Sequence, residues 1–116
     1  MQSTLSSFKY AISGFRDAIK SEPNLSVHFL FAVIALIFAY FLEFNLVEFT
    51  ILVITIFFVI TLELINTIVE KLVDLHSLER SEEARQIKDI SAGVVLLGAI
   101  ASIIIALFLF LPKLII

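Results

Sequence analysis

The chain has 116 residues, of which 60% are hydrophobic and 16% are charged, and its mean hydropathy is +1.09. This length allows one domain, and this composition is too apolar for a soluble globular protein. The chain has no cysteine, which excludes disulfides and thiolate metal sites, and a formal charge of −3 without a basic run argues against nucleic-acid binding. We therefore predict a small polytopic all-α membrane protein.

Residues 5–20 are predicted to form an amphipathic helix. Large apolar side chains recur there at helical spacing, at Phe8, Ile12, Phe15 and Ile19. The opposite face carries Lys, Arg, Asp and Ser side chains. This pattern is typical of a helix that lies in a membrane surface. The alternative is a soluble helix packed on a core, but the remaining chain offers almost no soluble core.

Pro23 is predicted to end this surface helix and to begin the next one. The segment Ser21-Glu22-Pro23-Asn24 therefore places Glu22 at a hinge between a surface helix and a spanning helix. The simpler interpretation is that Glu22 is a first-turn acid, which the helix dipole favours.

Three apolar segments are long enough to span a membrane, at about 25–42, 49–70 and 92–111. A short acidic turn without a cation separates the first two segments, and Pro112 is expected to stop the third. The polar segment 71–91 is predicted to be a cytoplasmic loop, in which Ser81 caps a new helix. His28, near the polar end of the first span, is interpreted as an interfacial histidine.

The distribution of cations predicts the topology. Seven of the eight Lys and Arg residues lie before the first span or between the second and third. The positive-inside rule therefore places the N-terminus and the polar segment in the cytoplasm, and the C-terminus outside.

A polar stripe runs along one side of the second span and continues beyond it, formed by Glu63, Asn66, Glu70 and Asp74. Glu70 and Asp74 lie within ~20° of Glu63 around a helix, and Asn66 lies within ~60° of it. Glu63 follows fourteen uncharged residues, and an ionisable group at such a depth is a functional-site hypothesis by default. The alternative is a neutral buried acid that is hydrogen-bonded to Asn66, with solvated charges beyond it. Asp74 is interpreted as a helix-end charge.

The spacing of the stripe allows two acids to divide their roles. Glu63 and Glu70 are separated by ~10.5 Å along the helix, too far to share a proton directly. The deeper acid could act as a base, while Glu70 and Glu22 could hold a divalent cation such as Mg²⁺. Lys88 and Asp89, at the start of the third span, would supply a cation for a phosphate and an acid for positioning.

Three segments of the sequence resemble the prokaryotic diacylglycerol kinase family, which includes the undecaprenol kinases. They are S-E-P-N (21–24), E-L-I-N-T-I-V-E-K-L-V-D (63–74) and K-D-I-S-A-G-V-V-L (88–96). The resemblance implies an integral lipid kinase of the bacterial cytoplasmic membrane. It implies transfer of the γ-phosphate of MgATP to the primary hydroxyl of a membrane lipid, undecaprenol or diacylglycerol, by a homotrimer with active sites shared between subunits.

The resemblance also implies a role for each motif residue. Glu63 is similar to the general base and Asn66 to its polar support, whereas Glu22 and Glu70 are similar to the metal ligands. The expected nucleotide contacts are Lys88 and Asp89, with Tyr10 and Glu79 as further contacts.

Some positions depart from the family pattern. Pro23 replaces a basic residue, Ser81 replaces a frequent histidine, and Arg85 replaces the first lysine of an A-K-x-A-K-D run. These departures affect the expected nucleotide contacts and leave the catalytic residues in place. The S-E-x-N hinge with His28 is more similar to the branch that phosphorylates undecaprenol.

A non-enzymatic transporter or assembly protein, with Glu63 as a coupling acid, is the alternative function. A transporter needs that acid near the midplane of the bilayer. Glu63 instead lies toward the cytoplasmic end of its span, which favours the kinase.

Overall fold

The computed structural model describes residues 3–76 and 81–115. In these residues the chain forms four helices, which are α1 (Thr4–Ser21), α2 (Pro23–Phe41), α3 (Leu46–His76) and α4 (Glu82–Ile115). Three of them, α2, α3 and α4, are long and apolar enough to cross a membrane, with mean hydropathies of 2.0, 2.4 and 3.1 over an 18-residue stretch of each. The predicted all-α architecture with three candidate membrane spans is therefore confirmed.

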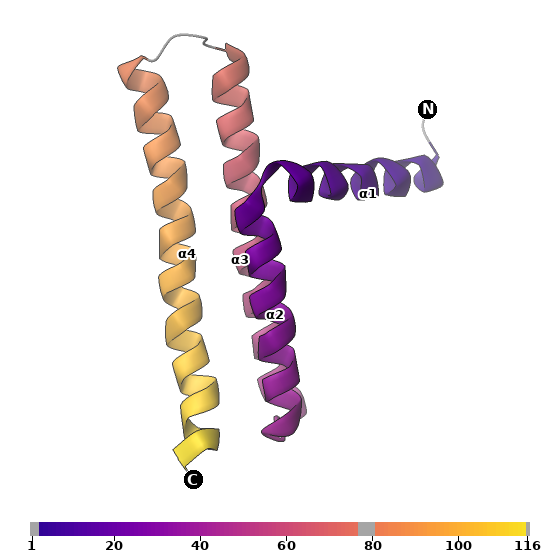
Figure 1. Cartoon of the computed structure of the whole chain (residues 1–116), viewed down its shortest axis with the longest axis vertical. Coiled ribbons are helices and arrows are strands. Elements are labelled where there is room, and N and C mark those ends of the chain that lie inside the picture. The colour runs from indigo at the N-terminus through magenta and orange to yellow at the C-terminus, as the bar shows by residue number, and fades with distance from the viewer. Residues whose placement is uncertain (1–2, 77–80, 116) are drawn as a thin grey trace.

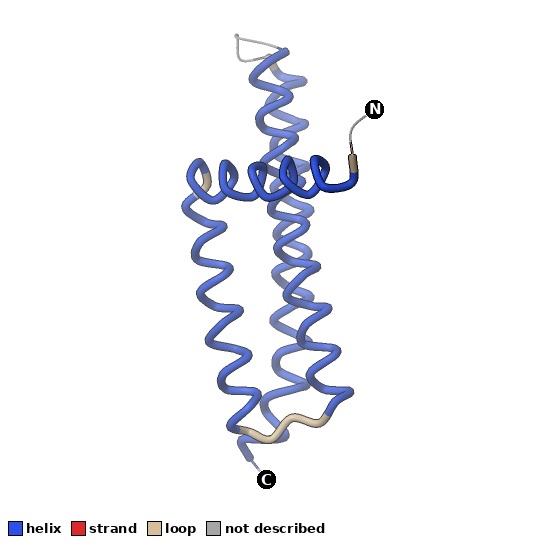
Figure 2. Tube along the Cα trace, turned by 90° about the vertical axis from the view of Figure 1, so that its right-hand side faces the viewer, coloured by secondary structure: helices blue, strands red, loops and turns tan. Residues whose placement is uncertain are grey.

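The three long helices run side by side, whereas α1 leads away crosswise from the start of α2 (Figure 1). α3 is the central element, because it packs against α4 along most of its length and also contacts α2. The turned view shows α2 descending beside the α3–α4 pair (Figure 2). α3 and α4 also continue past the level of α1 (Figure 1).

A single residue separates α1 from α2. Glu22 is extended, with φ −122° and ψ 99°, and Pro23 is the first residue of α2. The N–H of Glu22 donates to the carbonyl of Ala18 at 2.9 Å, and its own carbonyl accepts from the N–H of Leu25 at 3.1 Å. The extended Glu22 confirms the helix break predicted at Pro23. The physical reason is that proline moves the preceding residue out of the α region and suits the first position of a helix.

The turn between α2 and α3 is closed by hydrogen bonds to the end of α2. Glu43 adopts the left-handed region, with φ 58°. Its N–H donates to the carbonyl of Tyr40 at 3.2 Å, and the N–H of Phe44 donates to that of Ala39 at 3.1 Å. These two bonds form a Schellman motif, which satisfies carbonyls that a helix end leaves free.

The same end of the molecule is tied to α4. Asn45 and Glu48 cap the start of α3 reciprocally, at 2.8 and 2.9 Å. The Nζ of Lys113 lies 3.0 Å from a carboxylate oxygen of Glu48 and 5.9 Å from the centre of the Phe44 ring. The cation that pairs with the acidic turn is thus Lys113, near the C-terminal end of the chain. A small buried hydrophobic cluster lies at the same end of the molecule, formed by Ala39, Phe44, Leu52 and Leu109.

One predicted boundary, at Pro112, is wrong. The polar segment 71–91, predicted as a loop with a helix start at Ser81, is largely helical, because α3 continues to His76 and α4 begins at Glu82. Ser81 caps α4 as predicted, and its Oγ accepts from the N–H of Ala84 at 3.0 Å. Pro112 lies inside α4 rather than ending it. Its missing N–H removes a bond only in the last turn, where a proline disturbs little of the helix.

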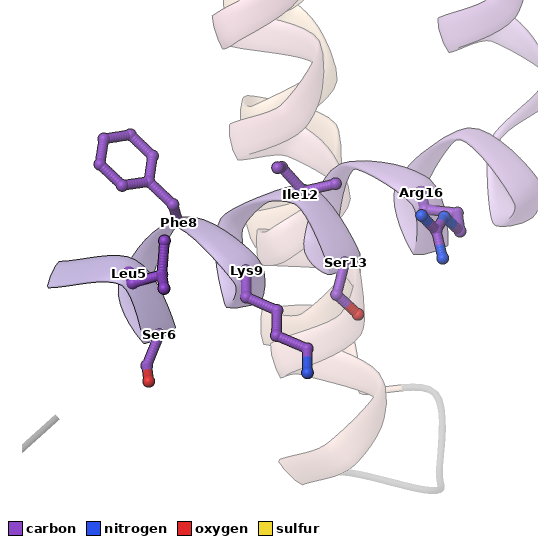
Figure 3. Close-up of a pocket in the computed structure, with 7 residues that line it drawn as sticks. All are labelled: Leu5, Ser6, Phe8, Lys9, Ile12, Ser13 and Arg16. Atoms are coloured by element: carbon purple, nitrogen blue, oxygen red, sulfur yellow. The ribbon is translucent and has the colours of Figure 1, made fainter. Parts of the chain in front are cut away.

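α1 has no buried residue. Phe8 and Ile12 project from one side of it, whereas Lys9 and Ser13 project from the opposite side (Figure 3). The placement of α1 in a membrane surface stays a prediction.

Candidate active site

The polar stripe of α3 lies on the packed side of the helix. Glu63 is buried, with 6% of its surface exposed, and Thr67 is buried beside it. Asn66 and Glu70 are half-buried, whereas Ile65 and Ile68 are about half exposed. An acidic side chain buried among apolar helices is a candidate for chemistry rather than for stability.

The polar side chains of Asn66 and Thr67 form hydrogen bonds within α3, but not with the carboxylate of Glu63. The side-chain amide of Asn66 donates to Oε1 of Glu70 at 3.3 Å. The hydroxyl of Thr67 donates to the backbone carbonyl of Glu63 at 3.1 Å, and therefore does not use its carboxylate. The buried Oδ1 of Asn66 has no hydrogen-bond partner in the described part of the chain. The alternative of a Glu63 carboxyl that is hydrogen-bonded to Asn66 is therefore not what the structure contains.

The carboxylate of Glu63 instead faces a histidine of α2. Nε2 of His28 lies 3.5 Å from Oε2 of Glu63. The sequence indicated only an interfacial histidine at position 28, because contact with Glu63 depends on how α2 and α3 are rotated against each other. In the structure His28 lies three residues after Leu25, which is 1% exposed, and shares its packed face of α2. The sequence offers no signal of this burial.

The predicted nucleotide contacts lie at the start of α4. Nζ of Lys88 lies 2.6 Å from Oδ1 of Asp74, so that the residue interpreted as a helix-end charge joins α3 to α4. Asp89 accepts from Arg85 at 2.6 Å. Arg85 also pairs with Glu82, and this hydrogen bond lowers the pKa of the Glu82 carboxyl. Three acids and two cations therefore meet at the paired ends of α3 and α4.

The predicted metal ligands come from different helices. Glu70 lies on α3, and the half-buried Glu22 lies at the junction of α1 and α2. Across residues 3–76 and 81–115, no three acidic or histidine side chains form a group that could hold a metal ion. Tyr10 is 62% exposed on α1, which leads away from α4 (Figure 1). The predicted contact at Glu79 lies outside the described residues.

These features define a small helical membrane protein with a buried acid in its central helix and a charged cluster beyond it. The model of the prokaryotic diacylglycerol kinase family matches residues 9–110. The chain belongs to the prokaryotic diacylglycerol kinase family, and it is an enzyme of the lipid kinase type.

The chain is similar to several curated proteins. It is 36% identical over 108 residues to the undecaprenol kinase of Bacillus subtilis (strain 168), which covers 93% of the chain and 88% of the relative. It is 37% identical over 111 residues to a diacylglycerol kinase of Synechocystis sp., covering 95% of the chain but 63% of that longer relative. It is 31% identical over 85 residues to the diacylglycerol kinase of Haemophilus influenzae, covering 73% of the chain and 72% of the relative.

Proposed function

We propose that this protein transfers the γ-phosphate of MgATP to the primary hydroxyl of a membrane lipid, undecaprenol or diacylglycerol. The observation that carries the proposal is Glu63, a carboxylate with 6% of its surface exposed on a membrane-spanning helix. A lipid hydroxyl is held at a similar depth by its own apolar chain, so that base and acceptor meet without a large orientation cost.

In this mechanism Glu63 is the general base. The lipid oxygen forms a bond to the γ-phosphorus while the bond from that phosphorus to the leaving ADP oxygen breaks. The hydroxyl proton passes to the Glu63 carboxylate. Phosphoryl transfer of this kind needs positioning and charge neutralisation more than covalent help. Lys88 and Asp89 would position the nucleotide, with Tyr10 and Glu79 as further contacts.

The residues present suit a hard divalent cation. Glu70 presents a half-buried carboxylate that is oriented by the Asn66 amide at 3.3 Å, and Asn66 Oδ1 beside it is a buried oxygen without a partner in the described structure. Mg²⁺ takes one or two protein carboxylates together with phosphate oxygens. Glu22 and Glu70 would hold Mg²⁺, which when bound neutralises phosphate charge.

We propose a homotrimer in which neighbouring subunits complete each site, with the active site and N-terminus in the cytoplasm and the C-terminus outside. Two observations support shared sites. α1 carries Tyr10 away from the charged ends of α3 and α4 of its own chain (Figure 1). On α4, no atom lies within 4 Å of a Cβ built at Gly93, which leaves room for another helix.

The test is the purified full chain with MgATP and either diacylglycerol or undecaprenol, with the phosphorylated lipid as the readout. Glu63→Gln keeps the size of the side chain but removes the base, and we expect it to lower kcat by at least ~100-fold. Glu43→Gln, an exposed acid at the opposite end, is the matched control. A wild-type protein that phosphorylates neither lipid would refute the kinase reaction as proposed, and near-normal turnover of Glu63→Gln would refute the base assignment.

A further inference from the structure

The candidate base faces a polar side chain of another helix. Nε2 of His28, on α2, lies 3.5 Å from Oε2 of Glu63, on α3. Within residues 3–76 and 81–115, His28 is the side chain that brings a polar atom to ion-pair distance of this carboxylate. Thr67 and Asn66, the next polar side chains after Glu63 on α3, bond to the Glu63 backbone and to Glu70 instead.

The pair joins a buried group to a more accessible one. The Glu63 side chain is 8% exposed and the His28 side chain is 30% exposed. His28 is three residues after Leu25, which is 1% exposed, and so shares the face of α2 that is packed in the molecule. The imidazole is therefore held against α3 by the packing of its own helix rather than by chance contact of a free side chain.

A buried base needs such a neighbour. Glu63 accepts a proton only as a carboxylate, and a buried polar group needs a hydrogen-bond partner. An imidazole N–H directed at one carboxylate oxygen supplies that partner and fixes the plane of the group, leaving the second oxygen for the lipid hydroxyl. The separation of 3.5 Å is longer than an ordinary hydrogen bond. Catalytic hydrogen bonds of this kind are often long before substrate binds and shorten in the complex.

We propose that His28 is a positioning residue for the lipid kinase reaction, which holds the Glu63 carboxylate oriented for the substrate hydroxyl. This inference rests on the proposed function of Glu63 as the base. His28 acts through Glu63 and need not touch the lipid, the nucleotide or the metal. Its removal should therefore slow the chemical step without weakening nucleotide binding.

The test compares two substitutions in the purified full chain, assayed with MgATP and the better of the two lipids. His28→Leu keeps an apolar side chain in the helix contact and removes both ring nitrogens. We expect it to lower kcat by about tenfold or more, with the KM for MgATP unchanged within about twofold. His28→Gln, which retains a side-chain N–H donor, should recover kcat to within about threefold of the wild type. Ser26→Ala, an exposed polar position on the same helix, is the control.

A second comparison separates positioning from folding. In the Glu63→Gln background, where no carboxylate remains to be positioned, adding His28→Leu should change the residual rate by less than about twofold. If the His28→Leu protein does not fold, His28→Asn, whose amide is too short to reach Glu63, takes its place in both comparisons. The proposal is overturned if removing the imidazole leaves kcat unchanged, if it raises only the KM for MgATP, or if His28→Gln is as slow as His28→Leu. Inactivity of the wild type would instead contradict the kinase function itself.

Discussion

Asp74 of α3 and Lys88 of α4 form an ion pair, with 2.6 Å between Oδ1 and Nζ. The two residues are fourteen positions apart along the chain and join the paired ends of the two helices. Lys88 is also the proposed phosphate contact, so the carboxylate of Asp74 competes with a nucleotide for the same ammonium group.

Asp74→Asn should therefore lower the KM for MgATP. Because both side chains are at least 40% exposed, the pair is worth little, and we expect a decrease of less than about fivefold. Lys88→Met should raise the same KM. Steady-state kinetics with varied MgATP measures both effects, with Asp17→Asn on α1 as the control. A higher KM in Asp74→Asn would show that Asp74 orients Lys88 rather than competing for it.

Glu70→Ala should raise the concentration of Mg²⁺ that gives half-maximal rate by about tenfold or more, because it removes one of two proposed carboxylate ligands. It should change the KM for lipid by less than about twofold. The measurement is the rate against free Mg²⁺ at saturating lipid and ATP, and Glu83→Gln is the control. A change confined to the KM for lipid would contradict the metal role.

Gly98→Leu should destabilise the contact between α3 and α4. A Cβ at this buried glycine would clash with Cδ1 of Leu62, and the larger side chain forces further displacement. We expect a loss of about 1–3 kcal/mol, measured as a lower thermal midpoint in detergent. Adding Leu62→Ala should recover part of it, because it removes the opposing atoms. Gly14→Ala, where no atom lies within 4 Å of the added Cβ, should not lower the midpoint. An unchanged midpoint in Gly98→Leu would contradict this packing.

Lys113→Met should affect stability but not catalysis. It removes the 3.0 Å pair with Glu48 and the contact with the Phe44 ring, both at the end opposite Glu63. Because the pair is partly exposed, the thermal midpoint should fall by less than about 3 °C. The kcat should stay within about twofold of the wild type. A large fall in kcat at an unchanged midpoint would show that this end of the molecule reaches the active site.

Local sequence signals were enough to predict the helices and the polar stripe. Pro23 predicts the break between α1 and α2 because its effects act on adjacent residues. The spacing of Glu63, Asn66 and Glu70 predicts their shared face because it depends only on the helical repeat. The cap at Ser81 predicts the start of α4 in the same way, whereas the contact between Asp74 and Lys88, which joins the polar ends of α3 and α4, was not predicted.

The contacts between helices could not be read from the sequence. His28 meets Glu63, and Lys113 meets Glu48, only because the rotation and height of each helix are set by packing over its whole length. A histidine near a membrane boundary has many uses, and nothing in its neighbours indicates a partner thirty-five positions away. The same limit applies to Pro112, whose small effect depends on its place in the last turn of α4.

Glu22 is the single non-helical residue between α1 and α2. The direction in which each side of α1 faces therefore depends on the number of residues between that side and Glu22. One residue inserted in the last turn of α1 would rotate everything before it by about 100° and move it outward by about 1.5 Å. The side that carries Phe8 and Ile12 would then no longer face the way it does in Figure 3. A substitution on α1 changes one side chain, whereas an insertion or deletion there turns the whole helix surface. Lengths of α1 that differ by a few residues are therefore not interchangeable, even when their compositions are the same.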